Sequence, residues 1–125
     1  MRVTHVNTSE KSGGAARAAY RLHQGLSGIG VDSSMYVRHK SSQDENVERY
    51  NAPRGSIIQP IRDRLVRRWL NSRFNAYQDT RPNGLEIFSQ ARTFDGGRVA
   101  QQRPSADIYN LHWISGFVDP LFFFD

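Results

Sequence analysis

The chain contains no cysteine and no long hydrophobic run. None of its 125 residues is Cys, which excludes a disulfide scaffold, a zinc-thiolate site and a cysteine nucleophile, and which fits a reducing compartment. No apolar run approaches the roughly 18 residues that a membrane-spanning helix requires, and the first residues lack the apolar stretch of a signal peptide. We therefore expect a soluble, cytoplasmic protein.

Lysine and acidic residues are scarce relative to arginine. The 17 Lys+Arg residues exceed the 12 Asp+Glu residues and give a formal net charge of +5, and all the basic residues except Lys11 and Lys40 are arginines. Because Arg makes forked contacts with phosphates and carboxylates, we expect anionic ligands or surfaces as partners. The 38% of hydrophobic residues provides the core of one domain, and the length leaves little room for a second.

The histidines outside the last strand do not form a metal-binding pattern. His5, His23 and His39 are far apart in the sequence, without the short spacing that metal ligands share. We therefore expect no metal site.

The first forty residues predict a strand, a helix and a second strand. The strands are expected at 2–6 and 32–38, and Gly28 and Gly30 are expected to end the helix. Residues at helical spacing give that helix one apolar face: Ala15, Ala19, Leu22, Leu26 and Ile29. Two strands joined by such a helix pair in parallel through a right-handed crossover.

Gly13 and Gly14 stand at the turn between this strand and helix. A glycine turn that enters a helix exposes backbone N–H groups at the helix N-terminus, where the helix dipole favours an anion. Such a turn can hold a phosphate or a sugar. Taken alone, the pattern equally fits an ordinary tight corner.

The middle of the chain is less regular. Polar loops are expected at 39–53 and around 95–98, and a weak strand at 85–88. Residues 57–77 predict an amphipathic helix, in which Arg62–Arg73 holds five Arg against Asp63, a local charge of +4. We favour packing of its apolar stripe on the sheet, with solvated arginines. Attachment to an anionic membrane surface is the alternative, whereas nucleic acid binding lacks any supporting motif.

Residues 106–113 form the best strand candidate of the second half, and with the N-terminus they resemble a known family. Residues 3–23, from Val3-Thr4-His5-Val6-Asn7-Thr8 through Gly13-Gly14-Ala15-Ala16-Arg17, resemble the start of bacterial glycosyltransferases of the GT-B fold, family 4. Residues 106–117, with Asn110-Leu111-His112-Trp113, are similar to the strand and loop that carry a characteristic His there. Two motifs in the right order are more specific than either alone.

The resemblance implies an α/β fold, a Rossmann-like open parallel sheet with flanking helices that forms the acceptor-side domain of GT-B enzymes. It implies that Gly13 and Gly14 approach the nucleotide-sugar donor or the acceptor, and that His112, as the catalytic residue, lies at the end of its strand near the anomeric carbon. Asn110, Trp113 and Arg17 are assigned to substrate binding, with packing as the alternative role for Trp113. The implied reaction transfers a hexose, with retention, to a saccharide or lipid-linked acceptor in envelope polysaccharide synthesis, without a metal or other cofactor.

The second domain of this family has no counterpart in the chain. The sequence stops at Phe122-Phe123-Phe124-Asp125, and the resemblance places the nucleotide-sugar domain beyond this point. We therefore expect 1–125 to be one incomplete domain with negligible activity alone and with a complementary C-terminal domain chain as a partner. The alternative is a non-catalytic remnant or interaction module, with a basic surface that binds anions or the inner face of the membrane, or with an apolar C-terminal edge that binds a partner.

Overall fold

The computed structural model describes residues 1–52, 61, 64–65, 68–69, 71–72, 75–76, 93 and 95–124. The strands are β1 (Arg2–Ser9), β2 (Asp32–His39), β3 (Val47–Arg49) and β4 (Ile108–Leu111). The helices are α1 (Gly14–Gly28), α3 (Gly96–Gln101) and α4 (Pro120–Phe123). Within these described ranges, no helix is both long and apolar enough to cross a bilayer.

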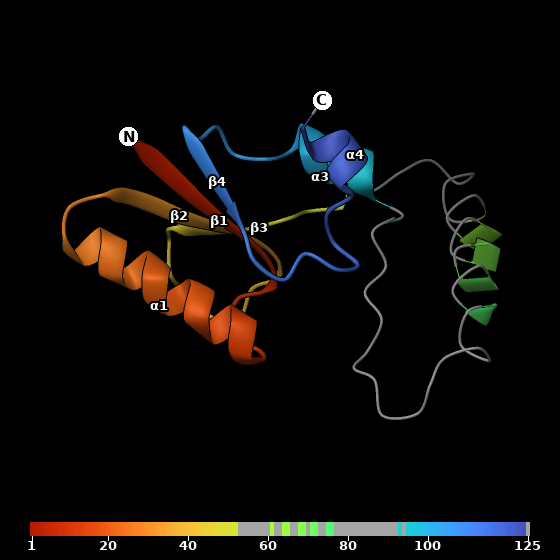
Figure 1. The fold of residues 1–125 in the computed structure, drawn as a ribbon, viewed down its shortest axis with the longest axis horizontal. Coiled ribbons are helices and arrows are strands. Elements are labelled where there is room, and N and C mark those ends of the chain that lie inside the picture. The colour runs from red at the N-terminus through yellow and green to blue at the C-terminus, as the bar shows by residue number, and fades with distance from the viewer. Residues whose placement is uncertain are drawn as a thin grey trace.

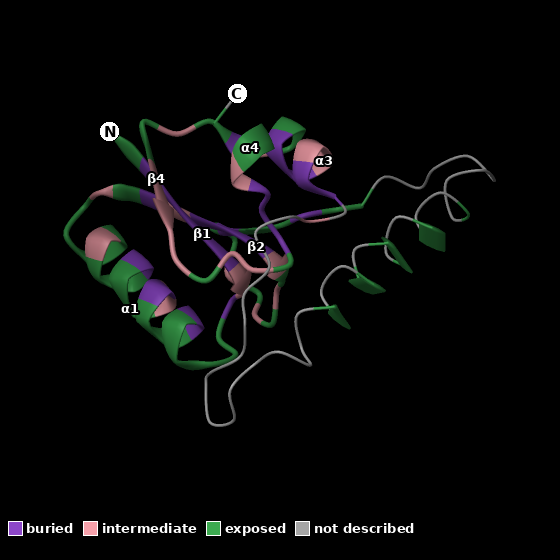
Figure 2. Ribbon diagram, turned by 45° about the vertical axis from the view of Figure 1, so that its right-hand side comes forward, coloured by how far each residue is buried: buried purple, intermediate pink, exposed green. Residues whose placement is uncertain are grey.

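The four strands form one parallel sheet in the order β3-β2-β1-β4 (Figure 1). This order matches the first four positions of the Rossmann strand order, 3-2-1-4-5-6. The chain is thus an α/β protein with an all-parallel sheet and flanking helices, as the sequence predicts. The two central strands, β1 and β2, each have a neighbouring strand on both sides, and their middle residues are buried (Figure 2).

Helices cover both faces of the sheet, because successive side chains of a strand point to opposite faces. On one face Met35 and Val37 of β2 pack with Ala19 of α1. On the other face Tyr36 belongs to a cluster with Val99 of α3, Phe117 and Val118 before α4, and Phe123 of α4. Figure 1 shows α1 and the α3–α4 pair on different sides of the strands. The two faces therefore have separate apolar clusters.

Several predicted boundaries need correction. The loop predicted at 39–53 contains β3, because Val47 is an apolar residue that the sheet buries to 2% exposure beside Met35. The polar loop predicted around 95–98 is the start of α3, in which Val99 and Ala100 anchor a short helix to the core. The strand predicted at 106–113 is shorter and ends at Leu111. The predicted strand 85–88 lies outside the described residues.

The predicted helix 57–77 has helical backbone at each described residue from 61 to 75. Three members of its apolar stripe are exposed, Ile61 at 63%, Leu65 at 62% and Trp69 at 59%. The expected packing of this stripe on the sheet is therefore wrong for these three residues. Periodicity predicts an amphipathic helix, but it does not say what covers the apolar face.

Candidate functional site

A cavity of about 320 Å³ lies at the C-terminal end of β1. Residues 7–9 at the end of β1, residues 12–16 at the start of α1, and Trp113 after β4 line it. Open parallel sheets bind ligands beyond the carboxyl ends of their strands. The cavity therefore lies where this fold class places its ligand sites.

Gly13 shapes the floor of this cavity. It is the N-cap residue of α1, with φ 91° and ψ 169°, a conformation that is essentially restricted to glycine. A Cβ at Gly13 or Gly14 would meet no atom within 4 Å, so backbone conformation, and not crowding, requires glycine at Gly13. Among the described residues no side chain caps α1, and the first turn of α1 has no acidic residue. The first N–H groups of α1 therefore have no side-chain acceptor.

Two polar residues of β1 join the opposite walls of the cavity. Oδ1 of Asn7 accepts a hydrogen bond from the backbone N–H of Trp113 at 2.7 Å. Oγ1 of Thr8 donates to the carbonyl oxygens of Trp113 at 2.9 Å and Ser115 at 3.0 Å. Asn7 and Thr8 are site residues that were not predicted from the sequence. Their signal was the run of polar side chains at the end of an otherwise buried strand.

The predicted site residues do not all meet in the cavity. Gly13, Gly14 and Trp113 line it, and the side chain of Trp113 is 49% exposed. Arg17 is exposed one turn into α1, where its Nε donates to the carbonyl oxygen of Gly13 at 3.4 Å. The site therefore joins the two sequence motifs through the glycine turn and Trp113, with Arg17 near the turn.

Asn110 and His112 lie outside the cavity lining. Asn110 is partly buried in β4, where it is paired in register with His5 of β1. His112 directly follows β4, and its backbone N–H donates to the carbonyl oxygen of Val6 at 3.0 Å. Its Nε2 lies 3.2 Å from Nδ1 of His5. His112 thus occupies the predicted strand end, beside Trp113, with its ring against His5.

Three imidazoles gather between β1, β4 and α1. The ring of His5 lies 5.4 Å from that of His112 and 6.3 Å from that of His23, measured between centroids. Burial, with the nearby His112 and His23, lowers the pKa of His5 to about 4. Burial also lowers the pKa of His112. These rings are therefore neutral at pH 7, and the described residues contain no group of three or more His, Cys, Asp or Glu that could hold a metal.

His23 is the exception in having an acidic neighbour. Its Nδ1 lies 2.9 Å from Oγ of Ser33, and its Nε2 lies 3.8 Å from Oδ2 of Asp44. Burial lowers the pKa of His23, and the carboxylates of Asp44 and Glu10 only partly oppose this effect. Asp44 also accepts a hydrogen bond from the hydroxyl of Tyr20 at 3.1 Å. The loop between β2 and β3 is thereby connected to α1.

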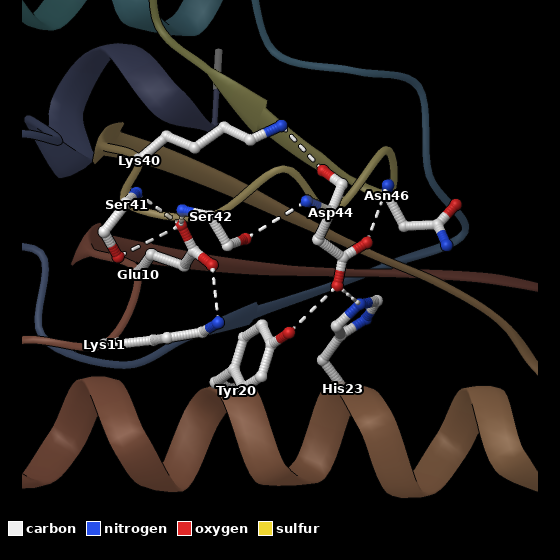
Figure 3. A network of polar contacts seen from close by, with 9 residues as sticks. All are labelled: Glu10, Lys11, Tyr20, His23, Lys40, Ser41, Ser42, Asp44 and Asn46. Carbon is white, nitrogen blue, oxygen red and sulfur yellow. Dashed lines mark hydrogen bonds and ion pairs between the residues drawn. The ribbon is translucent and has the colours of Figure 1, made fainter.

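A buried carboxylate attaches the same loop to the glycine turn. Oε2 of Glu10, whose side chain is 0% exposed, accepts hydrogen bonds from the backbone N–H groups of Ser41 at 2.5 Å and Ser42 at 2.9 Å (Figure 3). Lys11 forms an ion pair with Oε1 at 3.4 Å. Burial raises the pKa of Glu10, but the hydrogen bonds from Ser42, Ser41 and Lys11 outweigh it and lower this pKa to about 2. Glu10 is therefore ionised and structural.

No protein-family model, curated protein or solved structure matches the chain. The resemblance to glycosyltransferases therefore stays a prediction from the two motifs.

Proposed function

We propose that the chain is the acceptor-side part of a GT-B glycosyltransferase, similar to family 4, that helps to transfer a hexose from a nucleotide-sugar to a saccharide or lipid-linked acceptor. The observation that carries the proposal is the shared cavity. It is bounded by Gly13 and Gly14 from the first motif and by Trp113 from the second. The resemblance rests on these same two segments, which the sequence alone keeps far apart.

The lining of the cavity suits a hydroxyl-rich or anionic ligand. The first turn of α1 offers N–H groups without a capping side chain, and such groups bind phosphate or sugar oxygens. Ser9, Ser12 and Thr8 add hydroxyl groups. The half-exposed indole of Trp113 offers an apolar surface against which a sugar ring can lie. These groups can bind and orient a substrate, and correct positioning of the donor and the acceptor is a main contribution to catalysis of glycosyl transfer.

Cleavage of the donor requires stabilisation of the departing nucleoside diphosphate. Oriented N–H groups and cations provide it, because they interact favourably with the negative charge of the leaving group. The α1 turn supplies N–H groups, and Arg17 lies next to it. In the resembling enzymes the remaining cations come from a second domain. We therefore propose that residues 1–125 alone bind ligand weakly and transfer sugar only together with a nucleotide-sugar domain.

Ligand binding to the 15N-labelled protein tests this proposal. Titration with UDP-glucose, GDP-mannose, UDP and GDP is expected to shift the backbone amide signals of Gly13, Gly14 and Trp113. Gly14→Leu adds a side chain to the cavity lining, where no atom lies within 4 Å of the new Cβ, and is expected to weaken binding at least tenfold. The matched control is Gly25→Leu, an exposed position on the same helix. Equal binding by the two variants would contradict the cavity as the binding site.

A second candidate function, an interaction module that binds an anionic membrane, is favoured by the exposed stripe Ile61, Leu65 and Trp69. Arg64 and Arg68 are exposed on the same helical stretch. Apolar and basic side chains together suit the interface of an anionic bilayer. Co-sedimentation is expected with phosphatidylglycerol vesicles at low salt but not with phosphatidylcholine vesicles. The double variant Arg64→Glu/Arg68→Glu should lose binding, and retention of binding would exclude this surface.

A further inference from the structure

His5 is a fully buried polar residue in the middle of β1. Its side chain is 0% exposed, and it does not line the cavity. Its Nδ1 lies 3.2 Å from Nε2 of His112, with the two rings tilted by 35°. His5 therefore does not touch a ligand in the cavity, and its side chain faces the ring of His112.

The direction of the hydrogen bond between the two rings follows from their surroundings. Both rings are neutral at pH 7, so each carries one proton, and one of the two facing nitrogens must donate to the other. Nε2 of His5 is buried and has no hydrogen-bond partner among the described residues. If His112 donated, the proton of His5 would lie on this Nε2, as a buried N–H without an acceptor. Buried N–H groups of that kind are rare and cost about 1–3 kcal/mol.

The other groups around His5 do not change this result. His23 from α1 approaches His5 with its edge at 68°, but its own nitrogens face Ser33 and Asp44. In the sheet, His5 lies in register with Met35 of β2 and Asn110 of β4. The carboxylates of Asp44 and Glu10 act on His23 and on the loop after β2. Among the described residues no carboxylate pairs with His5, so an imidazolium is not stabilised at this position.

We infer that His5 is a positioning residue whose Nδ1–H donates to Nε2 of His112 and so holds His112 in the tautomer with its proton on Nδ1. The lone pair on Nε2 of His112 then accepts the hydrogen bond from His5, so the proton of His112 is on Nδ1 and Nδ1 is an N–H donor. The hydrogen bond that the His112 side chain makes among the described residues uses Nε2, and His112 is only partly buried. In the glycosyl transfer proposed above, on which this consequence rests, His112 binds an oxygen of the sugar or acceptor and does not act as a general base.

Nuclear magnetic resonance of the full 125-residue chain tests the tautomer directly. Two-bond 1H–15N correlation of the histidine rings at pH 7 distinguishes protonated from unprotonated ring nitrogens, and His112→Gln assigns the signals of His112. The expected spectrum shows His112 protonated at Nδ1 and unprotonated at Nε2, with His5 also protonated at Nδ1. A spectrum with His112 protonated at Nε2 would overturn the inference without any variant of His5.

Two substitutions separate positioning from mere packing. His5→Asn places an amide N–H near the position of Nδ1 and should keep the tautomer of His112. His5→Leu fills space without a donor, so His112 should change to the Nε2–H tautomer, which an imidazole side chain without a partner prefers. His39→Asn, at an exposed histidine, is the control and should change neither ring. An unchanged His112 signal in folded His5→Leu would contradict the inference.

These spectra are recorded without a ligand, so they do not depend on the proposed function. Loss of the expected tautomer with intact nucleotide-sugar binding overturns only the role of His5. The expected tautomer in a protein that binds none of the nucleotide probes overturns only the glycosyltransferase proposal.

Discussion

Oδ1 of Asn7 and the backbone N–H of Trp113 form a 2.7 Å hydrogen bond between residues 106 positions apart in the chain. The amide of Asn7 also donates to the carbonyl oxygen of Ser9 at 2.5 Å. One side chain, 1% exposed, thereby orients both the turn before α1 and the segment after β4. The two walls of the cavity thus depend on each other.

Replacement of Asn7 should uncouple these walls. Asn7→Ala leaves the N–H of Trp113 without its acceptor and is expected to lower the free energy of unfolding by about 1–3 kcal/mol. Urea denaturation measures this change. Asn46→Ala, at an exposed asparagine, should change the free energy of unfolding by no more than about 0.5 kcal/mol. Equal effects of the two variants would show that the Asn7 bond contributes little.

Glu10 should matter through its charge. Glu10→Gln keeps the shape of the side chain but converts charge-assisted hydrogen bonds from Ser41 and Ser42 into neutral ones, and is expected to cost about 1–2 kcal/mol of unfolding free energy at pH 7. Glu45→Gln at an exposed position is the matched control. Both variants are compared by urea denaturation, and a Glu10→Gln protein as stable as the control would contradict this assignment.

The same carboxylate predicts a pH dependence. The pKa of Glu10 is lowered to about 2 from its ordinary value of 4.5, so the folded state favours the ionised form. Its contribution is fully present above about pH 4.5 and is lost as pH falls toward 2. In this range the unfolding free energy of the natural chain should fall more steeply than that of Glu10→Gln. Parallel curves would contradict the lowered pKa.

His5 predicts a second loss of stability on acidification, in a pH range above that of Glu10. The pKa of His5 is lowered to about 4 from 6.5, so the unfolded chain binds the proton first as pH falls. The stabilisation is complete above pH 6.5 and declines toward pH 4, by up to about 1.4 kcal/mol per pH unit for this group. His5→Asn should reduce the slope between pH 4 and 6.5 by about one proton, as measured by urea denaturation. His39→Asn is the control, and equal slopes would exclude His5 as the source.

The sequence predicts the parallel α/β arrangement because β1, α1 and β2 each carry a strong local signal. The alternation of Met35, Tyr36 and Val37 between two apolar clusters follows from a strand buried on both faces. The three residues of β3 are too few to show a strand periodicity, so this strand is recognised only from its pairing with β2. The stability of α3 likewise depends on contacts of Val99 with the core, which local periodicity does not contain.

The candidate site is only partly predictable for a similar reason. The glycine turn has a local signature, since only glycine suits the conformation of Gly13. The pairing of His5 with His112 depends on the register of β1 with β4. This register brings together two side chains that are 107 residues apart in the sequence. A polar residue inside a buried strand indicates that a hydrogen-bond partner exists, but the local sequence does not identify that partner.

Gly13 and Gly14 should respond to the same added methyl group with opposite sign. Gly13→Ala introduces a Cβ at φ 91° and ψ 169°, a conformation that costs a non-glycine residue about 1–3 kcal/mol. Gly14→Ala lies at the first residue of α1, at ordinary helical φ, and should raise the free energy of unfolding by about 0.4–1 kcal/mol because it restricts the unfolded chain. A new Cβ meets no atom within 4 Å at either position, so crowding does not contribute to the difference. Urea denaturation of both variants measures it, and a loss of stability in Gly14→Ala as large as in Gly13→Ala would mean that backbone conformation is not what requires glycine at this turn.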